Sequence, residues 1–146
     1  MFKMFSGMLG IDVGIDLGSS NIVVYVKDKG IVFSEPAAIA AKKLPRGEGY
    51  EVIAVGHDAK AMSGKVPNGI EAIWPLDGGV ISNFDMTQEL IRYCLKRVSA
   101  NSSFVVHPRV VISIPAEVTG VERKAVIDAT LGAGASEAYV VEEPIS

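Results

Sequence analysis

The order in which strand-like and helix-like segments follow one another is the feature that most constrains the fold of this chain. Before Gly78 the apolar segments are short and rich in β-branched residues, whereas after Gly79 helical spacing appears and alternates with strand-like runs. Strands are predicted at 11–17, 22–26 and 31–33, with turn residues between them. Three strands this close in sequence predict an antiparallel meander.

The second half of the chain continues as helix, strand, helix and strand. Apolar residues at helical spacing predict an amphipathic helix over 82–99, and the apolar run 109–114 predicts a strand that Pro115 closes. The last strand is predicted at 138–141. This order is typical of an α/β fold in which the strands that follow helices run parallel to one another.

The second predicted helix has recognisable signals at both ends. Thr119 and Glu122 have the spacing of a capping box at its start, and Gly132 with Gly134 ends it. Apolar residues behind the capping box predict a buried stripe, which consists of Val121, Ala125, Val126 and Ala129.

The segment 36–76 has a different character from the rest of the chain. Its apolar pieces are short and are separated by prolines and glycines, namely Pro45, Gly47, Gly49, Pro67 and Gly69. This pattern predicts a small, loop-rich lobe beside the α/β part.

Composition excludes several classes of protein. The 146 residues are 49% hydrophobic, which suits one globular domain, with or without a small lobe, and argues against disorder. A net charge of −3 provides no basic surface for nucleic acid. The single cysteine, Cys94, excludes a disulfide framework and a multi-cysteine metal site. No apolar run is long enough to span a membrane and the first residues make a poor signal peptide, so we expect a soluble cytoplasmic protein.

The segment from Asp16 to Asn21 is a candidate phosphate site. Gly18 at a hairpin tip lets the backbone approach a ligand, and the N–H groups and hydroxyls of Ser19 and Ser20 are donors suited to phosphate. Asp16, at the end of the first strand, could hold a hydrated magnesium ion, because that ion takes few carboxylates. An ordinary hairpin turn is the simpler interpretation of this segment taken alone.

Two glutamates are candidates for catalysis. Glu122 is explained by the capping box, yet a carboxylate in the first turn of a helix could also polarise an attacking water. Glu143 lies before Pro144 at a predicted strand-to-helix junction, where α/β proteins often place active-site groups.

Taken together and in this order, these segments resemble the MreB family of rod-shape-determining bacterial actins. Three blocks carry the resemblance: GIDLGSSNIVVYVKDKGIVFSEPAAIA at 14–40, AVGHDAKAMSGKVPNGIEAIWPLDGGVISNFDMT at 54–87, and RVVISIPAEVTGVERKAVIDATLGAGASEAYVVEEP at 109–144. The phosphate hairpin and the third block also belong to the wider superfamily of actins and heat-shock chaperone ATPases. The middle block is what favours the MreB family.

The resemblance implies an α/β fold of the actin-like ATPase type. Residues 1–33 and 77–146 would form an incomplete ribonuclease-H-like subdomain, with residues 34–76 as a small inserted lobe. The resemblance assigns ATP and magnesium as ligands. It places Asp16, Gly18, Ser19, Ser20 and Asn21 in the first phosphate-binding hairpin, Glu122 beside the hydrolytic water, and Glu143 near the phosphates and the metal.

Two departures from the family pattern are visible. The hairpin reads Gly18-Ser19-Ser20-Asn21 where the family usually has G-T-A-N, which keeps one hydroxyl and the small size. Members of the family are also more than twice as long as this chain, so the second phosphate loop and the adenosine pocket lie beyond it. A cleft needs donors from both walls, so we expect weak nucleotide binding by this chain alone, and its own ATPase activity stays open.

The function implied is that of the N-terminal half of a cytoskeletal protein. It would form ATP-dependent homopolymers at the inner face of the cell membrane and act with cell-shape and wall-synthesis proteins. Two apolar segments would touch the membrane, one with Met1, Phe2 and Phe5 and the other with Phe104 and Val105. The alternatives are a chaperone-type or scaffolding module of the same fold that does not polymerise, and an inert, partly folded piece.

Overall fold

The structure is a computed structural model, which describes residues 12–62, 69–77, 80–81, 83–100, 107–114 and 119–142. Its larger sheet has five strands in the order β10-β9-β1-β2-β3. Strands β1 (Asp12–Leu17), β2 (Asn21–Val26) and β3 (Gly30–Pro36) form an antiparallel meander. Strand β9 (Arg109–Ile114) runs parallel to β1, and β10 (Glu137–Glu142) runs parallel to β9. The predicted meander and the predicted parallel strands are both confirmed.

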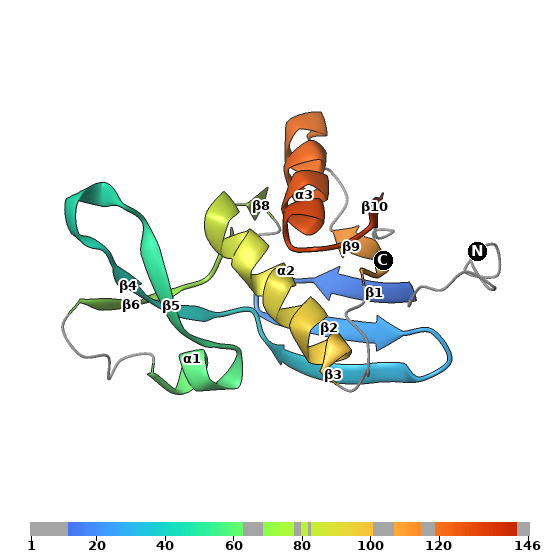
Figure 1. The fold of residues 1–146 in the computed structure, drawn as a ribbon, viewed down its shortest axis with the longest axis horizontal. Coiled ribbons are helices and arrows are strands. Elements are labelled where there is room, and N and C mark those ends of the chain that lie inside the picture. The colour runs from blue at the N-terminus through green and yellow to red at the C-terminus, as the bar shows by residue number, and fades with distance from the viewer. Residues whose placement is uncertain are drawn as a thin grey trace.

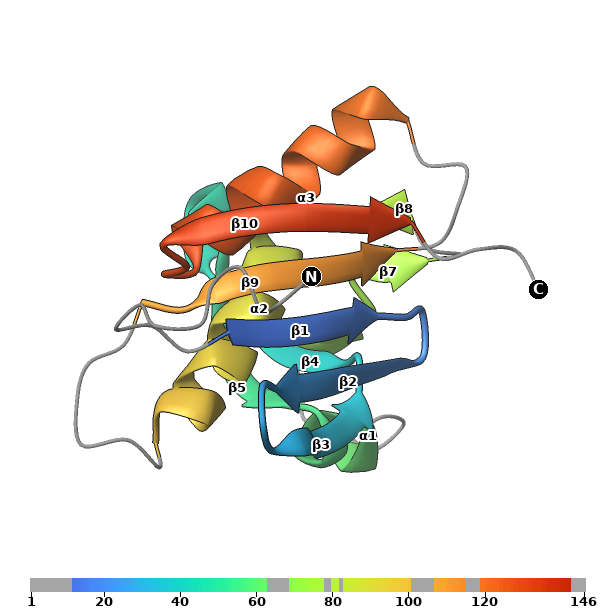
Figure 2. The same cartoon turned by 90° about the vertical axis from the view of Figure 1, so that its right-hand side faces the viewer.

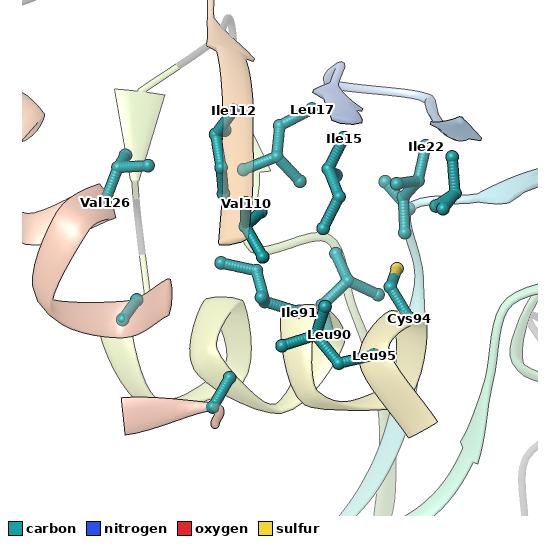
Figure 3. Close-up of a cluster of buried hydrophobic side chains, with 14 of the residues drawn as sticks. Ile15, Leu17, Ile22, Leu90, Ile91, Cys94, Leu95, Val110, Ile112 and Val126 are labelled. Carbon is teal, nitrogen blue, oxygen red and sulfur yellow. The ribbon is translucent and has the colours of Figure 1, made fainter. Parts of the chain in front are cut away.

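Helices α2 (Phe84–Ser99) and α3 (Gly120–Gly132) cover the same face of the five-stranded sheet (Figures 1 and 2). Alternate residues of the strands point toward these helices, as the period of a strand requires. Figure 3 shows where they meet: β-branched and leucine side chains of β1, β2 and β9 pack on Leu90, Ile91, Cys94 and Leu95 of α2. This apolar layer is the main core. Among the described residues, no helix is long and apolar enough to cross a bilayer.

The predicted buried stripe of α3 is wrong at its first member. Val121 is 81% exposed, whereas Val126, Ala129 and Thr130 are buried. Figure 2 shows α3 inclined to β10, with its first turn, which contains Val121, farther from the sheet than its last. The capping box at Thr119 and the helix end at Gly132 are confirmed.

A second, three-stranded antiparallel sheet lies beside the first, with the order β5-β4-β6 (Figure 1). Its strands are β4 (Ile39–Lys43), β5 (Tyr50–Val55) and β6 (Ile70–Ile73), and α1 (His57–Met62) packs on it. A one-turn helix, Pro45–Gly47, joins β4 to β5. Two short strands, β7 (Leu76–Asp77) and β8 (Val80–Ile81), pair with each other before α2.

The segment predicted to be loop-rich therefore contains a small sheet. It has its own small apolar cluster, formed by Ala38, Ala40 and Ala59 with the half-buried Trp74 beside them. The small side chains of Ala40 in β4 and Ala59 in α1 let this helix pack closely on the sheet. The predicted lobe boundaries at 34 and 76 stay predictions, and β3 runs past the first of them to Pro36.

Candidate phosphate-binding edge

Three parallel strands end at one edge of the five-stranded sheet. The register aligns Asp16 of β1 with Ser113 of β9, and Ser113 with Val141 of β10. The β1–β2 hairpin and the first turn of α3 lie at this same edge (Figure 2). In open α/β sheets, ligands bind outside the carboxyl ends of the strands. The fold thus places the hairpin and Glu122, two separate predictions, on one side of the molecule.

The hairpin Gly18–Asn21 is tightly closed. The Gly18 N–H donates to the Asn21 carbonyl oxygen over 2.9 Å. A Cβ at position 18 would lie 2.8 Å from that same carbonyl oxygen, a distance that real Cβ atoms do not show. Any side chain at this position would therefore open the turn, which explains why the sequence has glycine here.

The tip of the hairpin is also held from the side. The Ala37 N–H, between β3 and β4, donates to the Ser20 carbonyl oxygen over 2.9 Å. Ser20 and Asn21 are exposed, and Ser19 and Asp16 are half-buried. A fixed, glycine-containing turn with exposed polar residues has the chemistry of a phosphate cradle.

No group of three or more His, Cys, Asp or Glu side chains gathers in the described residues in a way that could hold a metal ion. Asp16, the predicted magnesium ligand, is half-buried near the carboxyl end of β1, and its role as a ligand stays a prediction. Cys94 offers no alternative chemistry, because burial raises the pKa of its thiol to about 12 and keeps it protonated.

Glu122 completes the capping box with one of its two carboxylate oxygens. Its Oε1 accepts from the Thr119 hydroxyl over 3.0 Å and from the Thr119 N–H over 3.4 Å. In return, the Glu122 N–H donates to the Thr119 hydroxyl oxygen over 3.1 Å. The second oxygen, Oε2, is buried and has no hydrogen-bond partner in the part of the chain that the structure describes. A buried carboxylate oxygen without a partner is costly, and a water or ligand group could satisfy it.

Glu143 lies outside the described residues. The five proposed membrane residues also lie outside them, namely Met1, Phe2, Phe5, Phe104 and Val105. Glu142, the last residue of β10, is described and forms an ion pair with Arg123 of α3. The Arg123 guanidinium also donates to the Val140 carbonyl oxygen over 3.2 Å.

Arg123 thus ties the end of β10 to the first turns of α3. Sequence reasoning missed this role, although Arg123 directly follows Glu122 in the sequence.

Comparison with known proteins decides the family. The family model described as MreB/Mbl protein matches residues 10–146. The chain belongs to the MreB/Mbl family. It is 42% identical over all 146 residues to the cell shape-determining protein MreB of Escherichia coli K12, of which it spans 42%. It is 39% identical over 137 residues, or 94% of this chain, to the cell shape-determining protein Mbl of Bacillus subtilis 168, of which it spans 40%.

Solved structures confirm the actin-like fold. MreB5 of Spiroplasma citri bound to ADP superposes with a TM-score of 0.76 and 28% identity, over 92% of this chain and 38% of that protein. The same protein bound to AMPPNP gives a TM-score of 0.74 over 92% of this chain and 39% of its own. A MamK double helical filament, at 22% identity and a TM-score of 0.72 over 92% of this chain and 41% of MamK, supports the fold alone. This MreB/Mbl chain therefore has the actin-like α/β fold that its sequence predicted.

Proposed function

We propose that this chain forms the phosphate-binding wall of a nucleotide cleft in an actin-like ATPase that determines cell shape. The observation that carries this proposal is the closed hairpin Gly18–Asn21 at the carboxyl end of β1. Support comes from the Spiroplasma citri relative, whose structures hold ADP or AMPPNP and align with 92% of this chain.

The hairpin residues would bind the phosphates as donors. Gly18 allows the backbone to come close, and Ser19, Ser20 and Asn21 supply N–H groups and polar side chains at the tip. A magnesium ion, when bound, would neutralise phosphate charge, and Asp16 is the carboxylate that would hold its hydration shell. The Ala37 bond to the Ser20 carbonyl keeps these donors in place before the ligand arrives.

The two glutamates would act on the water. Glu122 keeps Oε1 in the capping box, so only Oε2 is available to orient or polarise a water molecule. Glu143, which follows the last described residue of β10, is the second candidate and would lie near the phosphates and the metal. The opposite wall of the cleft must come from chain beyond this one, which spans 42% of the Escherichia coli relative.

In the cell, we propose that the whole protein forms ATP-dependent homopolymers in the cytoplasm, at the inner face of the membrane. Phe2, Phe5 and Phe104, with their neighbours Met1 and Val105, would provide the membrane contacts. Cell-shape and wall-synthesis proteins are the partners proposed for the polymer. Relatives named as cell shape-determining proteins support this proposal at the level of the family.

The proposal is tested by substituting the hairpin glycine in the full-length protein. Gly18→Ala places a Cβ 2.8 Å from a carbonyl oxygen and opens the hairpin, so ADP affinity should fall about tenfold or more. Gly14→Ala, in β1 just before the hairpin, is the matched control, because its Cβ would meet Tyr25 of the neighbouring strand β2 at an ordinary 3.6 Å. Isothermal calorimetry measures both. Equal ADP affinity for the two variants, or no ADP binding by the parent protein, contradicts the proposal.

A further inference from the structure

Glu35, a residue with no part in the proposed chemistry, lies buried where the two sheets meet. It stands near the end of β3 and is 6% exposed. The Tyr93 hydroxyl of α2 donates to its Oε2 over 2.9 Å, and the His57 N–H at the start of α1 donates to its Oε1 over 3.3 Å. Arg97 of α2 forms an ion pair with Oε2. One carboxylate therefore joins β3, α1 and α2.

Aromatic rings hold the arginine of this cluster in position. The Arg97 guanidinium lies over the Phe33 ring, 4.1 Å from its centroid. Phe33 in turn meets Tyr93 edge to face, with centroids 6.4 Å apart. Stacking of this kind restrains a half-exposed arginine, so its charge stays beside the buried carboxylate.

The backbone of the small sheet approaches Glu35 as closely as sterics allow. Gly56, between β5 and α1, has a φ of +72°, and a Cβ there would lie 2.1 Å from Glu35 Oε1. Its N–H donates to the carbonyl oxygen of Ala38, just before β4, over 2.8 Å. Only glycine fits both this conformation and this contact. The loop that follows β5 of the three-stranded sheet thus contacts the carboxylate through backbone atoms.

The phosphate hairpin is next to this contact along β3. Glu35 is in register with Ile22 of β2, and Pro36 is in register with Asn21. One residue further, the Ala37 N–H holds the Ser20 carbonyl oxygen at the hairpin tip. A displacement of Glu35 therefore moves the peptide that braces the hairpin.

We propose that the Glu35 cluster, consisting of Glu35, Phe33, Tyr93, Arg97 and the Gly56–His57 backbone, sets the orientation of the three-stranded sheet and couples it to the hairpin. A rotation of the three-stranded sheet would pull on Glu35 and reach Ser20 through Ala37. Only the regulatory part of this inference rests on the proposed function, because it assumes that the hairpin binds phosphate. The mechanical coupling itself is testable without any nucleotide.

The test is amide hydrogen exchange in nucleotide-free, full-length protein, followed by mass spectrometry of peptides. Glu35→Gln leaves the shape but removes the charge that pairs with Arg97. Exchange should rise about tenfold in the segments 55–60 and 36–39, because the ion pair is lost and the remaining hydrogen bonds go to a neutral acceptor. Segment 109–114 should not change. Glu51→Gln, an exposed carboxylate of β5 in the same sheet, is the matched control and should change none of them.

A milder variant covers the case in which Glu35→Gln destabilises the whole protein. Tyr93→Phe keeps the ring and removes one bond to Glu35, so a smaller increase should appear in the same two segments. The proposal is overturned if neither variant raises exchange in both segments, 55–60 and 36–39. It is also overturned if Tyr93→Phe raises exchange equally at 109–114, or if Glu51→Gln raises it in the same two segments. Failure of the parent protein to bind ADP would contradict the proposed function and leave this result standing.

Discussion

At the scale of single residues, Glu122 has both a structural and a proposed catalytic role, and substitution can separate them. Glu122→Gln keeps an oxygen for Thr119 but loses the charge, so ATP hydrolysis by the full-length protein should fall by about 10²–10⁴ with little change in ATP binding. Glu122→Ala also breaks the capping box and should cost about 0.5–2 kcal/mol of stability. Phosphate release and thermal melting measure the two effects. If Glu122→Gln hydrolyses ATP at the parent rate, Glu122 has only the capping role.

Single residues also show where sequence reasoning stops. The capping box was predictable because Thr119 and Glu122 are three residues apart and meet within one helical turn. Two hydrogen-bond partners of Glu35, His57 and Tyr93, lie 22 and 58 residues away. No local sequence pattern predicts such a contact, because only the fold brings those segments together.

At the scale of elements, the period of α3 predicted a buried face but not where along the helix burial begins. Val121→Lys should change the free energy of unfolding by less than about 0.5 kcal/mol, because this side chain is 81% exposed. Val126→Ala should cost about 1.5 kcal/mol or more, because two buried methyl groups are lost at a site that is 2% exposed. Urea unfolding measures both. A larger loss for Val121→Lys than for Val126→Ala would mean that the first turn of α3 is buried after all.

Elements were otherwise well predicted where their signals are local. The three-strand meander, α2 and the parallel strands β9 and β10 follow from spacing and turn residues. The three-stranded sheet was missed because its short apolar segments are separated by prolines and glycines, a pattern that predicts loops. Its β4–β6 pairing joins segments on either side of β5 and α1, and β5 also contacts α2, so no short window of sequence contains these contacts.

At the scale of the whole molecule, the proposed membrane contacts must be weak singly and strong together. A few apolar side chains contribute at most about 1.5–3 kcal/mol each when they leave water. One copy would therefore bind a bilayer marginally, and a polymer would bind it firmly, because linked contacts act at a high effective concentration. Membrane binding should thus depend both on the aromatic residues and on polymerisation.

Liposome flotation of the full-length protein with ATP tests this dependence. Changing Phe2, Phe5 and Phe104 together to Ser should leave most of the protein at the bottom of the gradient, whereas the parent floats. The control changes three exposed aliphatic residues of described elements to Ser, namely Ile31, Ile53 and Val121. It removes apolar surface elsewhere and should float like the parent. If the aromatic variant still polymerises and floats as well as this control, the membrane is bound by other residues and the two proposed segments have no part in it.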